Sequence, residues 1–209
     1  MYGAPPSITA EIYTEVPEAL RIRGRSSEWL YGRGGAAPHS FLEGPSFDRE
    51  GNLWLTDIVF GRIFRVNPAG AWTVVAEYDG EPNGLAFHRE GWAAITDAKR
   101  GLLRLNPQTG EVSSLLPRAR REGFRGVNDC TFSKTGDLFF TDQGQTGLQD
   151  PAGRVYRLRA GAQQADALVS NVPSPNGLVM TEDGHTLYVA ATRDNAIWRV
   201  PITEDGGVI

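Results

Sequence analysis

The sequence predicts an all-β fold of the β-propeller type, and three observations support this prediction. One sequence motif recurs in four similar copies, LEGPSFDREGNLWLTD, EPNGLAFHREGWAAITD, GVNDCTFSKTGDLFFTD and SPNGLVMTEDGHTLYVAA. Each copy leads into further short apolar segments between polar turns, and the 25 glycines and 13 prolines are spread along the chain. No long stretch has the period of about 3.6 residues that a helix requires. Short strands in repeats of 40 to 48 residues are typical of propeller blades.

Each repeat divides into about four predicted strands. In the first repeat, PSF precedes a polar turn, LWLTD is a strand, and RIFRV mixes apolar with basic residues as a strand with one solvated face does. Similar third segments recur as RGLLRLNP, GRVYRLRAG and NAIWRVPI, and fourth apolar segments lie at 72–78, 112–116 and 167–172. The stretch PRARREGF from Pro117 is interpreted as a charged connector. The repeats are 42–80, 81–125, 126–173 and 174–209, within one incomplete propeller domain over 1–209.

A β-sandwich is the competing architecture, since it also has short strands and regular turns. It would not predict a polar residue at the same place in every repeat, and here Glu43, Asn83, Asn128 and Asn176 follow one another at steps of 40, 45 and 48. The repeats account for about four blades, whereas most propellers have more. We therefore expect the chain to be the N-terminal part of a larger ring.

Composition limits the class of function. The 209 residues carry a formal net charge of -4 without a basic cluster, which argues against nucleic acid or an anionic membrane as partner. No run approaches the roughly 20 apolar residues of a membrane helix. The single cysteine, Cys130, excludes an internal disulfide, and the N-terminus lacks the features of a secretory signal, so we expect a cytoplasmic protein. The sequence does not indicate an oligomeric state.

The recurring polar residues predict a metal site. In a propeller, the loops that enter the innermost strands meet at the mouth of the central channel, so Glu43, Asn128 and Asn176 should converge. One carboxylate and two amide oxygens suit Ca²⁺, with Mg²⁺ as the second choice. Zn²⁺ would prefer His and Cys ligands, and the three histidines occupy unrelated positions of the repeat: His39, His88 and His185.

Several of these residues also have a structural interpretation. Pro-Asn-Gly, which contains Asn83 and Asn176, is common in turns because Asn and Gly tolerate positive φ. Glu43 has no such role in a turn. The Thr-Asp pairs that end the second strand of three repeats are interpreted as structural, with side chains that satisfy backbone donors of the next turn. Cys130 has no histidine placed to activate it and is expected in the core.

Three motifs resemble a known family. LEGPSFDREGNLW, GVNDCTF and SPNGLVM are similar to the three N-terminal metal-site motifs of the SMP-30/gluconolactonase/luciferin-regenerating-enzyme family of six-bladed propellers. GVNDCTF is also similar to the matching segment of the squid-type diisopropylfluorophosphatase. The resemblance runs from about residue 42 to residue 201, and its specificity lies in the order and spacing of the motifs.

The resemblance implies an enzyme that opens a sugar lactone or related ester with the help of a divalent cation, with Mn²⁺ and Zn²⁺ as further candidates. Glu43, Asn128 and Asn176 match the family's metal ligands. Asn83 matches no usual ligand and is a candidate for substrate contact. Arg125 and Asp129, which lie close to Asn128 in sequence, are candidates for substrate or indirect metal contact.

The catalytic residue is not assigned. The family takes its fourth ligand, which also serves as base or nucleophile, from an aspartate in a later P-D-G motif, and we expect that aspartate beyond Ile209. The present chain is accordingly expected to bind calcium weakly and to hydrolyse lactones little. The alternative function is a non-catalytic propeller that binds a protein or another ligand.

Overall fold

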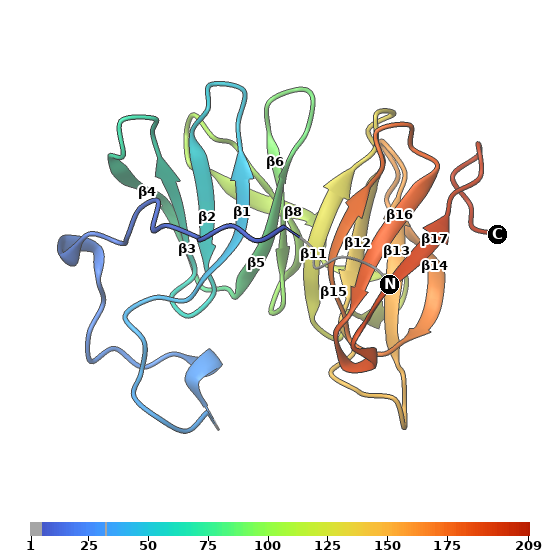
Figure 1. Cartoon of the computed structure of the whole chain (residues 1–209), viewed down its shortest axis with the longest axis horizontal. Coiled ribbons are helices and arrows are strands. Elements are labelled where there is room, and N and C mark those ends of the chain that lie inside the picture. The colour runs from blue at the N-terminus through green and yellow to red at the C-terminus, as the bar shows by residue number, and fades with distance from the viewer. Residues whose placement is uncertain (1–5, 32) are drawn as a thin grey trace.

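The computed structural model describes residues 6–31 and 33–209 and confirms the all-β prediction (Figure 1). Four antiparallel sheets stand side by side as propeller blades, and each sheet lies within one of the predicted repeats. Three short 3-10 helices are the helical elements of the described residues: η1 (Glu18–Leu20), η2 (Glu28–Leu30) and η3 (Thr192–Asp194). No helix in this part of the chain has the length and hydrophobicity needed to span a membrane.

Each blade is a meander in which consecutive strands pair. Blade 1 contains β1 (Leu42–Phe47), β2 (Leu53–Asp57), β3 (Arg62–Val66) and β4 (Trp72–Glu77). Blade 2 contains β5 (Pro82–Phe87), β6 (Ala93–Asp97), β7 (Gly101–Leu105) and β8 (Val112–Leu116). Blade 3 contains β11 (Val127–Phe132), β12 (Leu138–Asp142), β13 (Gly153–Leu158) and β14 (Ala165–Val172). Blade 4 has three strands, β15 (Pro175–Met180), β16 (Thr186–Ala191) and β17 (Ala196–Pro201).

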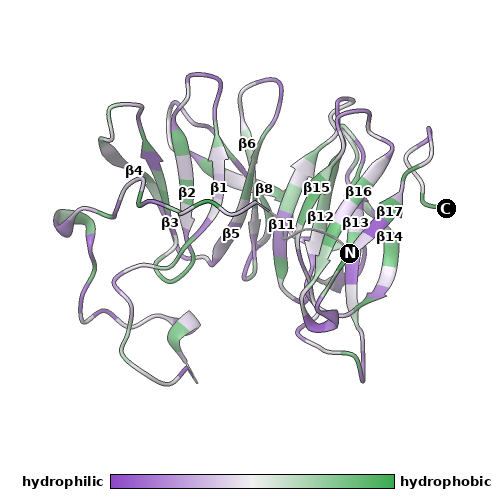
Figure 2. Cartoon of the chain, in the orientation of Figure 1, coloured by the Kyte–Doolittle hydropathy of each residue, from purple (hydrophilic) through white to green (hydrophobic). Residues whose placement is uncertain are grey.

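The apolar cores lie between blades. Because side chains alternate along a strand, neighbouring residues point to opposite faces of a sheet, and both faces of a central blade are covered. In β12, Phe140 packs toward blade 2 and Phe139 toward blade 4. In β7, Leu103 packs toward blade 1 and Leu102 toward blade 3. This explains the unbroken apolar runs of these strands, and Figure 2 shows hydrophobic residues concentrated in the strands and hydrophilic residues in the connecting turns.

The two outer faces of the row of blades differ. On blade 1, Phe64 and Val66 pack with Leu20 of the N-terminal segment. On the outward face of blade 4, Val179 and Ile197 are 58% and 74% exposed.

A buried ion pair anchors the N-terminal segment to blade 1. The guanidinium of Arg62 donates from Nε and Nη2 to Asp57 Oδ2, at 2.9 and 2.7 Å, and both side chains are buried. Its third nitrogen, Nη1, donates to the carbonyl oxygen of Leu20 at 2.6 Å. Since the charge is fully paired and hydrogen-bonded, the pair fixes the position of the segment where β3 begins.

The charged connector after blade 2 is more ordered than predicted. The stretch that starts at Pro117 forms a hairpin of two short strands, β9 (Arg118–Ala119) and β10 (Glu122–Gly123). Ala119 is buried in the core between blades 2 and 3, together with the partly buried Phe124. The two apolar residues in an otherwise charged stretch thus fold it against the blades.

The inner strands position the predicted site. They pack in the order β1, β5, β11, β15, and β1 runs upward in Figure 1, so that its first residues lie at the lower end of the molecule. Each inner strand has a register shift near its start, between Glu43 and Ser46 in β1 and at the equivalent places in the other three. A β-bulge redirects a side chain, and bulges are frequent beside functional sites.

Candidate functional site

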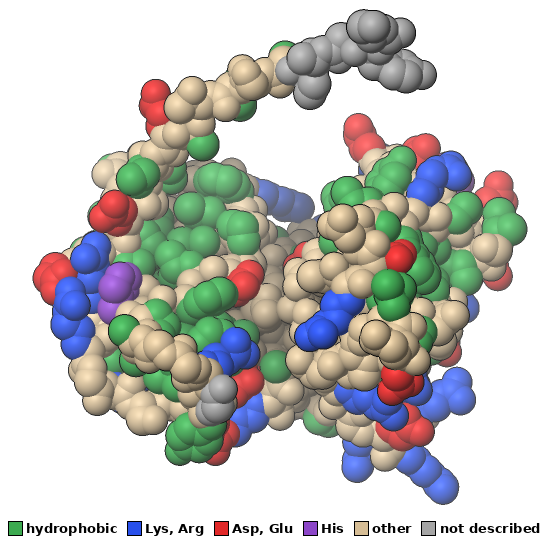
Figure 3. All heavy atoms as spheres, turned by 60° about the horizontal axis from the view of Figure 1, so that its bottom comes forward, with side chains coloured by type: hydrophobic (Ala, Val, Ile, Leu, Met, Phe, Trp, Pro, Cys, Tyr) green, Lys and Arg blue, Asp and Glu red, His purple; other side chains and the backbone are tan. Residues whose placement is uncertain are grey.

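The four recurring polar residues line one cavity. Glu43, Asn83, Asn128 and Asn176 come from the inner strands of blades 1, 2, 3 and 4, and they share a cavity of about 360 Å³. Asp129 lines it as well. Figure 3 brings the lower end of Figure 1 forward and shows a surface that is hollowed between the two halves of the molecule. The predicted convergence is therefore present, whereas the assignment of these residues as metal ligands remains a prediction.

The Pro-Asn-Gly motifs are not turns. Both lie inside inner strands, β5 and β15, and neither Asn83 nor Asn176 has a positive φ. The glycine of the first motif is needed for packing, since a Cβ on Gly84 would lie 2.6 Å from Asp129 Oδ1 and 2.7 Å from Asp129 Cα. The structural interpretation of these two asparagines as turn formers is wrong.

Gly44 has a comparable function beside Glu43. It has a φ of 53°, and a Cβ there would collide with the backbone of Asn83 and Leu85 in blade 2. A glycine after the polar residue thus lets the next inner strand approach closely. The close approach brings the polar side chains of neighbouring blades into one cavity.

The polar side chains at the cavity have free donors and acceptors. Within residues 6–31 and 33–209, no side-chain hydrogen bond is assigned to Glu43, Asn83, Asn128 or Asn176. Asn83 and Asn128 are each only 9% exposed. Buried amides are normally hydrogen-bonded, because an unpaired polar group is costly to bury. Their oxygen atoms are available to a ligand.

Asp129 is a second carboxylate at the cavity, and its orientation is fixed. Its Oδ1 accepts the backbone N–H of Cys130 at 2.8 Å, and its Oδ2 accepts that of Leu178 in blade 4 at 3.1 Å. Burial raises the pKa of Asp129, although these two N–H groups oppose the shift. Burial and, secondarily, the charge of Asp129 also raise the pKa of Glu43. The charged form of Glu43, which burial and the charge of Asp129 disfavour, would be stabilised by a nearby cation.

The side chains at the cavity suit a hard cation that accepts amide oxygens as well as carboxylates. Over the described ranges, no three His, Cys, Asp or Glu side chains are grouped closely enough to hold a metal ion. Ca²⁺, however, also accepts amide and carbonyl oxygens, in a flexible shell of about 6 to 8 ligands. Two carboxylates and three amides around one cavity provide such oxygens, so the residues present are compatible with Ca²⁺.

Arg125 is the one predicted site residue that the structure does not bring to the cavity. Its side chain is exposed and is absent from the lining, and its backbone N–H donates to Asp142 Oδ1 at 2.8 Å. Arg125 thus contributes a backbone hydrogen bond in the loop that enters β11. Of the two residues, Asp129 is the one that lines the cavity and stays a candidate for substrate contact.

Cys130 lies in the core as predicted, and the histidines lie outside the polar cavity. None of the histidines lines the cavity. His88 stacks on Trp92 with ring centroids 4.6 Å apart, and burial lowers its pKa. Cys130 is 5% exposed within the core between blades 2 and 3, and burial raises the pKa of its thiol. A neutral, buried thiol is a packing residue and a poor nucleophile.

The Thr-Asp pairs have more varied partners than predicted. Asp97 accepts the backbone N–H groups of Lys99 and Arg100 in the following turn, as expected. Asp57 and Asp142 instead accept N–H groups from the loops that lead into β1 and β11. In residues 6–31 and 33–209, the threonine hydroxyls instead donate to backbone carbonyls of the next blade, a contact that the sequence did not predict.

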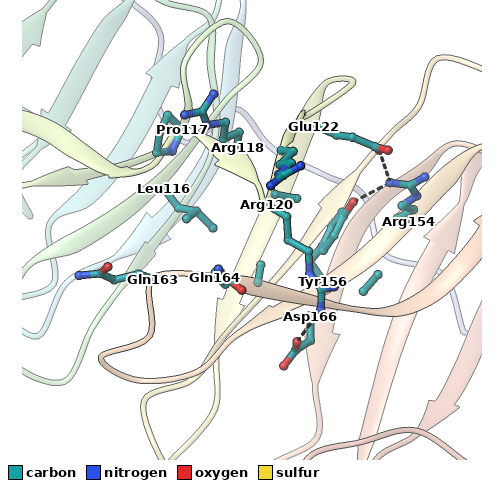
Figure 4. Close-up of a pocket in the computed structure, with 14 residues that line it drawn as sticks. Leu116, Pro117, Arg118, Arg120, Glu122, Arg154, Tyr156, Gln163, Gln164 and Asp166 are labelled. Carbon is teal, nitrogen blue, oxygen red and sulfur yellow. Dashed lines mark hydrogen bonds and ion pairs between the residues drawn. The ribbon is translucent and has the colours of Figure 1, made fainter.

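A larger cavity of about 990 Å³ lies away from the inner strands (Figure 4). It is enclosed by the β9–β10 hairpin, β13 and the start of β14, and its rim carries several arginines. Two of these are paired, Arg154 with Glu122 at 3.4 Å and Arg120 with Asp166 at 3.9 Å. This cavity shares no residue with the polar site.

Comparison with known proteins places these observations in a family context. The family model for the SMP-30/Gluconolactonase/LRE-like region matches residues 41–209. Lactonase drp35 of Staphylococcus epidermidis is 28% identical over 175 residues, which cover 80% of this chain and 53% of that protein. The chain therefore spans about half the length of the curated relatives it matches.

Solved structures agree on the fold. A gluconolactonase of Xanthomonas campestris has a TM-score of 0.72 at 23% identity, covering 81% of this chain and 60% of that one. Regucalcin of Agrobacterium tumefaciens, described as a calcium-binding protein, has a TM-score of 0.65 at 24% identity, covering 78% and 54%. At these identities the likeness establishes the fold alone. The homologues are six-bladed propellers, and this chain forms four blades.

Proposed function

The chain belongs to the SMP-30/gluconolactonase/LRE-like family, and from this premise we propose that it acts as a divalent-cation-dependent hydrolase of sugar lactones or related esters. The observation that carries the proposal is the cavity of about 360 Å³, which is lined by residues with carboxylate or amide side chains from all four blades. Family relatives are lactonases, which supports the reaction class. The fold alone would not, because propellers serve many functions.

Glu43, Asn128 and Asn176 would hold the cation, for which Ca²⁺ is the first choice. A bound divalent cation supplies Lewis acidity, which polarises a lactone carbonyl and favours attack by water. Asn83 lines the same cavity, and its amide can donate to a hydroxyl or ring oxygen of the substrate. Asp129 contributes negative charge from a fixed position, held by the N–H groups of Cys130 and Leu178.

Cation binding is the first test of this function. Calorimetric titration of the 209-residue chain with Ca²⁺, up to millimolar concentration, is expected to show one binding event that Glu43→Gln and Asn128→Ala weaken at least tenfold. Glu111→Gln is the matched control, because Glu111 is exposed, directly precedes β8 and does not line the cavity. Unchanged binding by both cavity variants would contradict the assignment of the site.

Hydrolysis is the second test. A panel of sugar and aliphatic lactones is assayed with Ca²⁺, Mg²⁺, Mn²⁺ or Zn²⁺ and after chelation. We expect little turnover by this chain, and we expect that turnover to depend on the cation, to be lost in Glu43→Gln and to be kept in Glu111→Gln. Cation binding without turnover of any lactone would favour the alternative, a propeller that binds its ligand without chemistry.

A further inference from the structure

A repeated hydrogen bond links each blade to the polar residue of the next. The threonine that precedes the aspartate at the end of each second strand donates its hydroxyl to the backbone carbonyl oxygen of the polar residue one blade onward. The three bonds are Thr56 to Asn83 at 2.6 Å, Thr96 to Asn128 at 2.5 Å and Thr141 to Asn176 at 2.8 Å. All three threonines are fully buried.

Two of these threonines, Thr96 and Thr141, also accept a hydrogen bond within their own blades. The N–H of Gly84 donates to Thr96 Oγ1 at 2.8 Å, and the N–H of Asp129 donates to Thr141 Oγ1 at 3.1 Å. Each of these N–H groups belongs to the peptide unit that follows a polar residue, Asn83 or Asn128. That peptide unit is therefore held at both ends, by the threonine of the preceding blade and by the threonine of its own blade.

These bonds form one continuous chain with a single direction. It runs from the Thr56 hydroxyl through the peptide after Asn83 to Thr96, and onward through the peptide after Asn128 to Thr141 and the carbonyl of Asn176. Carbonyl oxygens only accept, so the hydroxyl protons of Thr56 and Thr141 point to the next blade. The Thr96 hydroxyl has two carbonyl acceptors, Asn128 at 2.5 Å and, at the longer distance of 3.3 Å, Gly84 of its own blade. Consecutive bonds of this kind strengthen one another in a buried environment.

This series of hydrogen bonds ends at blade 4. The register pairs Pro175 with Ala191 as it pairs Val127 with Asp142, so Ala190 occupies the place of the threonine. Alanine has no hydroxyl to accept or donate. The three threonines thus serve the polar residues of blades 2, 3 and 4.

We propose that Thr96 and Thr141 are positioning residues for the cation site, an inference that rests on the proposed function. At a β-bulge the orientation of the peptide decides where the preceding side chain points. By fixing the carbonyls of Asn128 and Asn176, the two hydroxyls direct the amide groups of these asparagines into the cavity. Groups that orient metal ligands from behind typically change metal affinity by about 10 to 100-fold when removed.

The test compares Thr96→Val and Thr141→Val with the serine variants at the same positions. Valine keeps the shape and removes the hydroxyl, whereas serine keeps the hydroxyl. Thr186→Val is the control, because Thr186 is also a buried strand threonine, no side-chain hydrogen bond is assigned to it in the described ranges, and it lies at the opposite end of blade 4. Circular dichroism verifies the fold of each variant. Where a valine variant does not fold, the cysteine variant at the same position, Thr96→Cys or Thr141→Cys, replaces it, because a thiol is a weaker donor than a hydroxyl.

Two readouts are required. In calcium titrations, the valine variants should bind about 10 to 100-fold more weakly than wild type, and the serine and control variants within about threefold of it. Without metal, hydrogen exchange at the amide of Asp129 should accelerate at least tenfold in Thr141→Val, because its acceptor is gone. Faster exchange with unchanged calcium affinity would overturn the positioning role while leaving the proposed function intact. A wild-type chain that binds no divalent cation would overturn both, and the two failures differ in the behaviour of the wild type.

Discussion

The two Pro-Asn-Gly motifs are identical in sequence but differ in how much space surrounds their glycines, which gives a sharp prediction. A Cβ on Gly84 would lie 2.6 Å from the Oδ1 of Asp129, 2.7 Å from the Cα of the same residue and 2.9 Å from the carbonyl oxygen of Asn128. A Cβ on Gly177 would meet only the Oδ2 of Asp129, at the ordinary distance of 3.7 Å. Neither glycine has a positive φ. Gly84→Ala and Gly177→Ala therefore form a matched pair.

The expected difference follows from packing. Forcing a methyl group against backbone atoms costs about 1–3 kcal/mol, and more where the backbone cannot move. Both substitutions gain about 0.4–1 kcal/mol, because alanine restricts the unfolded chain more than glycine does. We expect Gly84→Ala to lose about 2 kcal/mol, which lowers Tm by roughly 4–8 °C in a protein of this size. Gly177→Ala should match or exceed the wild-type Tm.

Thermal unfolding followed by circular dichroism, with urea unfolding as a second measure, provides the assay. The urea m-value should be the same for both variants, because the substitution changes packing but does not change the surface area that unfolding exposes. If both alanine variants melt within about 1 °C of each other, the close approach of β5 and β11 does not determine stability, and Gly84 is not required for packing.

Two other predictions concern buried charges. Arg62→Ala should lower the free energy of unfolding by about 3–5 kcal/mol, because it leaves Asp57 buried without its partner, and limited proteolysis should cut near Leu20 faster than in wild type; equal cleavage rates would contradict the anchoring role. Burial raises the pKa of Asp97, so the folded state favours the neutral carboxyl. The neutral carboxyl therefore contributes stability fully below the pKa of the unfolded state, and this contribution is lost as pH rises through the pKa of the folded state. Asp97→Asn, which stays neutral, should therefore gain stability relative to wild type as pH rises from 4 to 7 in urea unfolding, and a difference that is constant with pH would refute the assignment.

The repeat predicted the convergence of the polar residues because periodicity carries over directly into geometry. Equivalent positions in equivalent blades must face the same axis, so Glu43, Asn128 and Asn176 could be placed without coordinates. Periodicity does not identify Asp129 in the same way. Its equivalents in other repeats are glycines such as Gly44, and a residue without a recurring counterpart has no periodic signal that marks it as part of the cavity.

Contacts between blades were harder to predict than strands. The Thr-Asp pairs were visible in the sequence, yet the partner of the Thr96 hydroxyl depends on how closely two inner strands approach. That distance is determined by Gly84 and by the cores on either side, and no local pattern encodes it. The hairpin after Pro117 was missed for a similar reason, since Ala119 is ordered by apolar neighbours that belong to two different blades.

The arrangement of the inner strands has a consequence for how disturbances spread. Within the described residues, each blade folds from a continuous stretch of sequence, and extensive contacts join only neighbours in the order β1, β5, β11, β15. Such a molecule resembles a one-dimensional array, in which stability is the sum of unit and nearest-neighbour contributions. Damage at one interface should thus remain local: a substitution between blades 1 and 2 leaves the hydrogen-exchange protection of blade 4 unchanged.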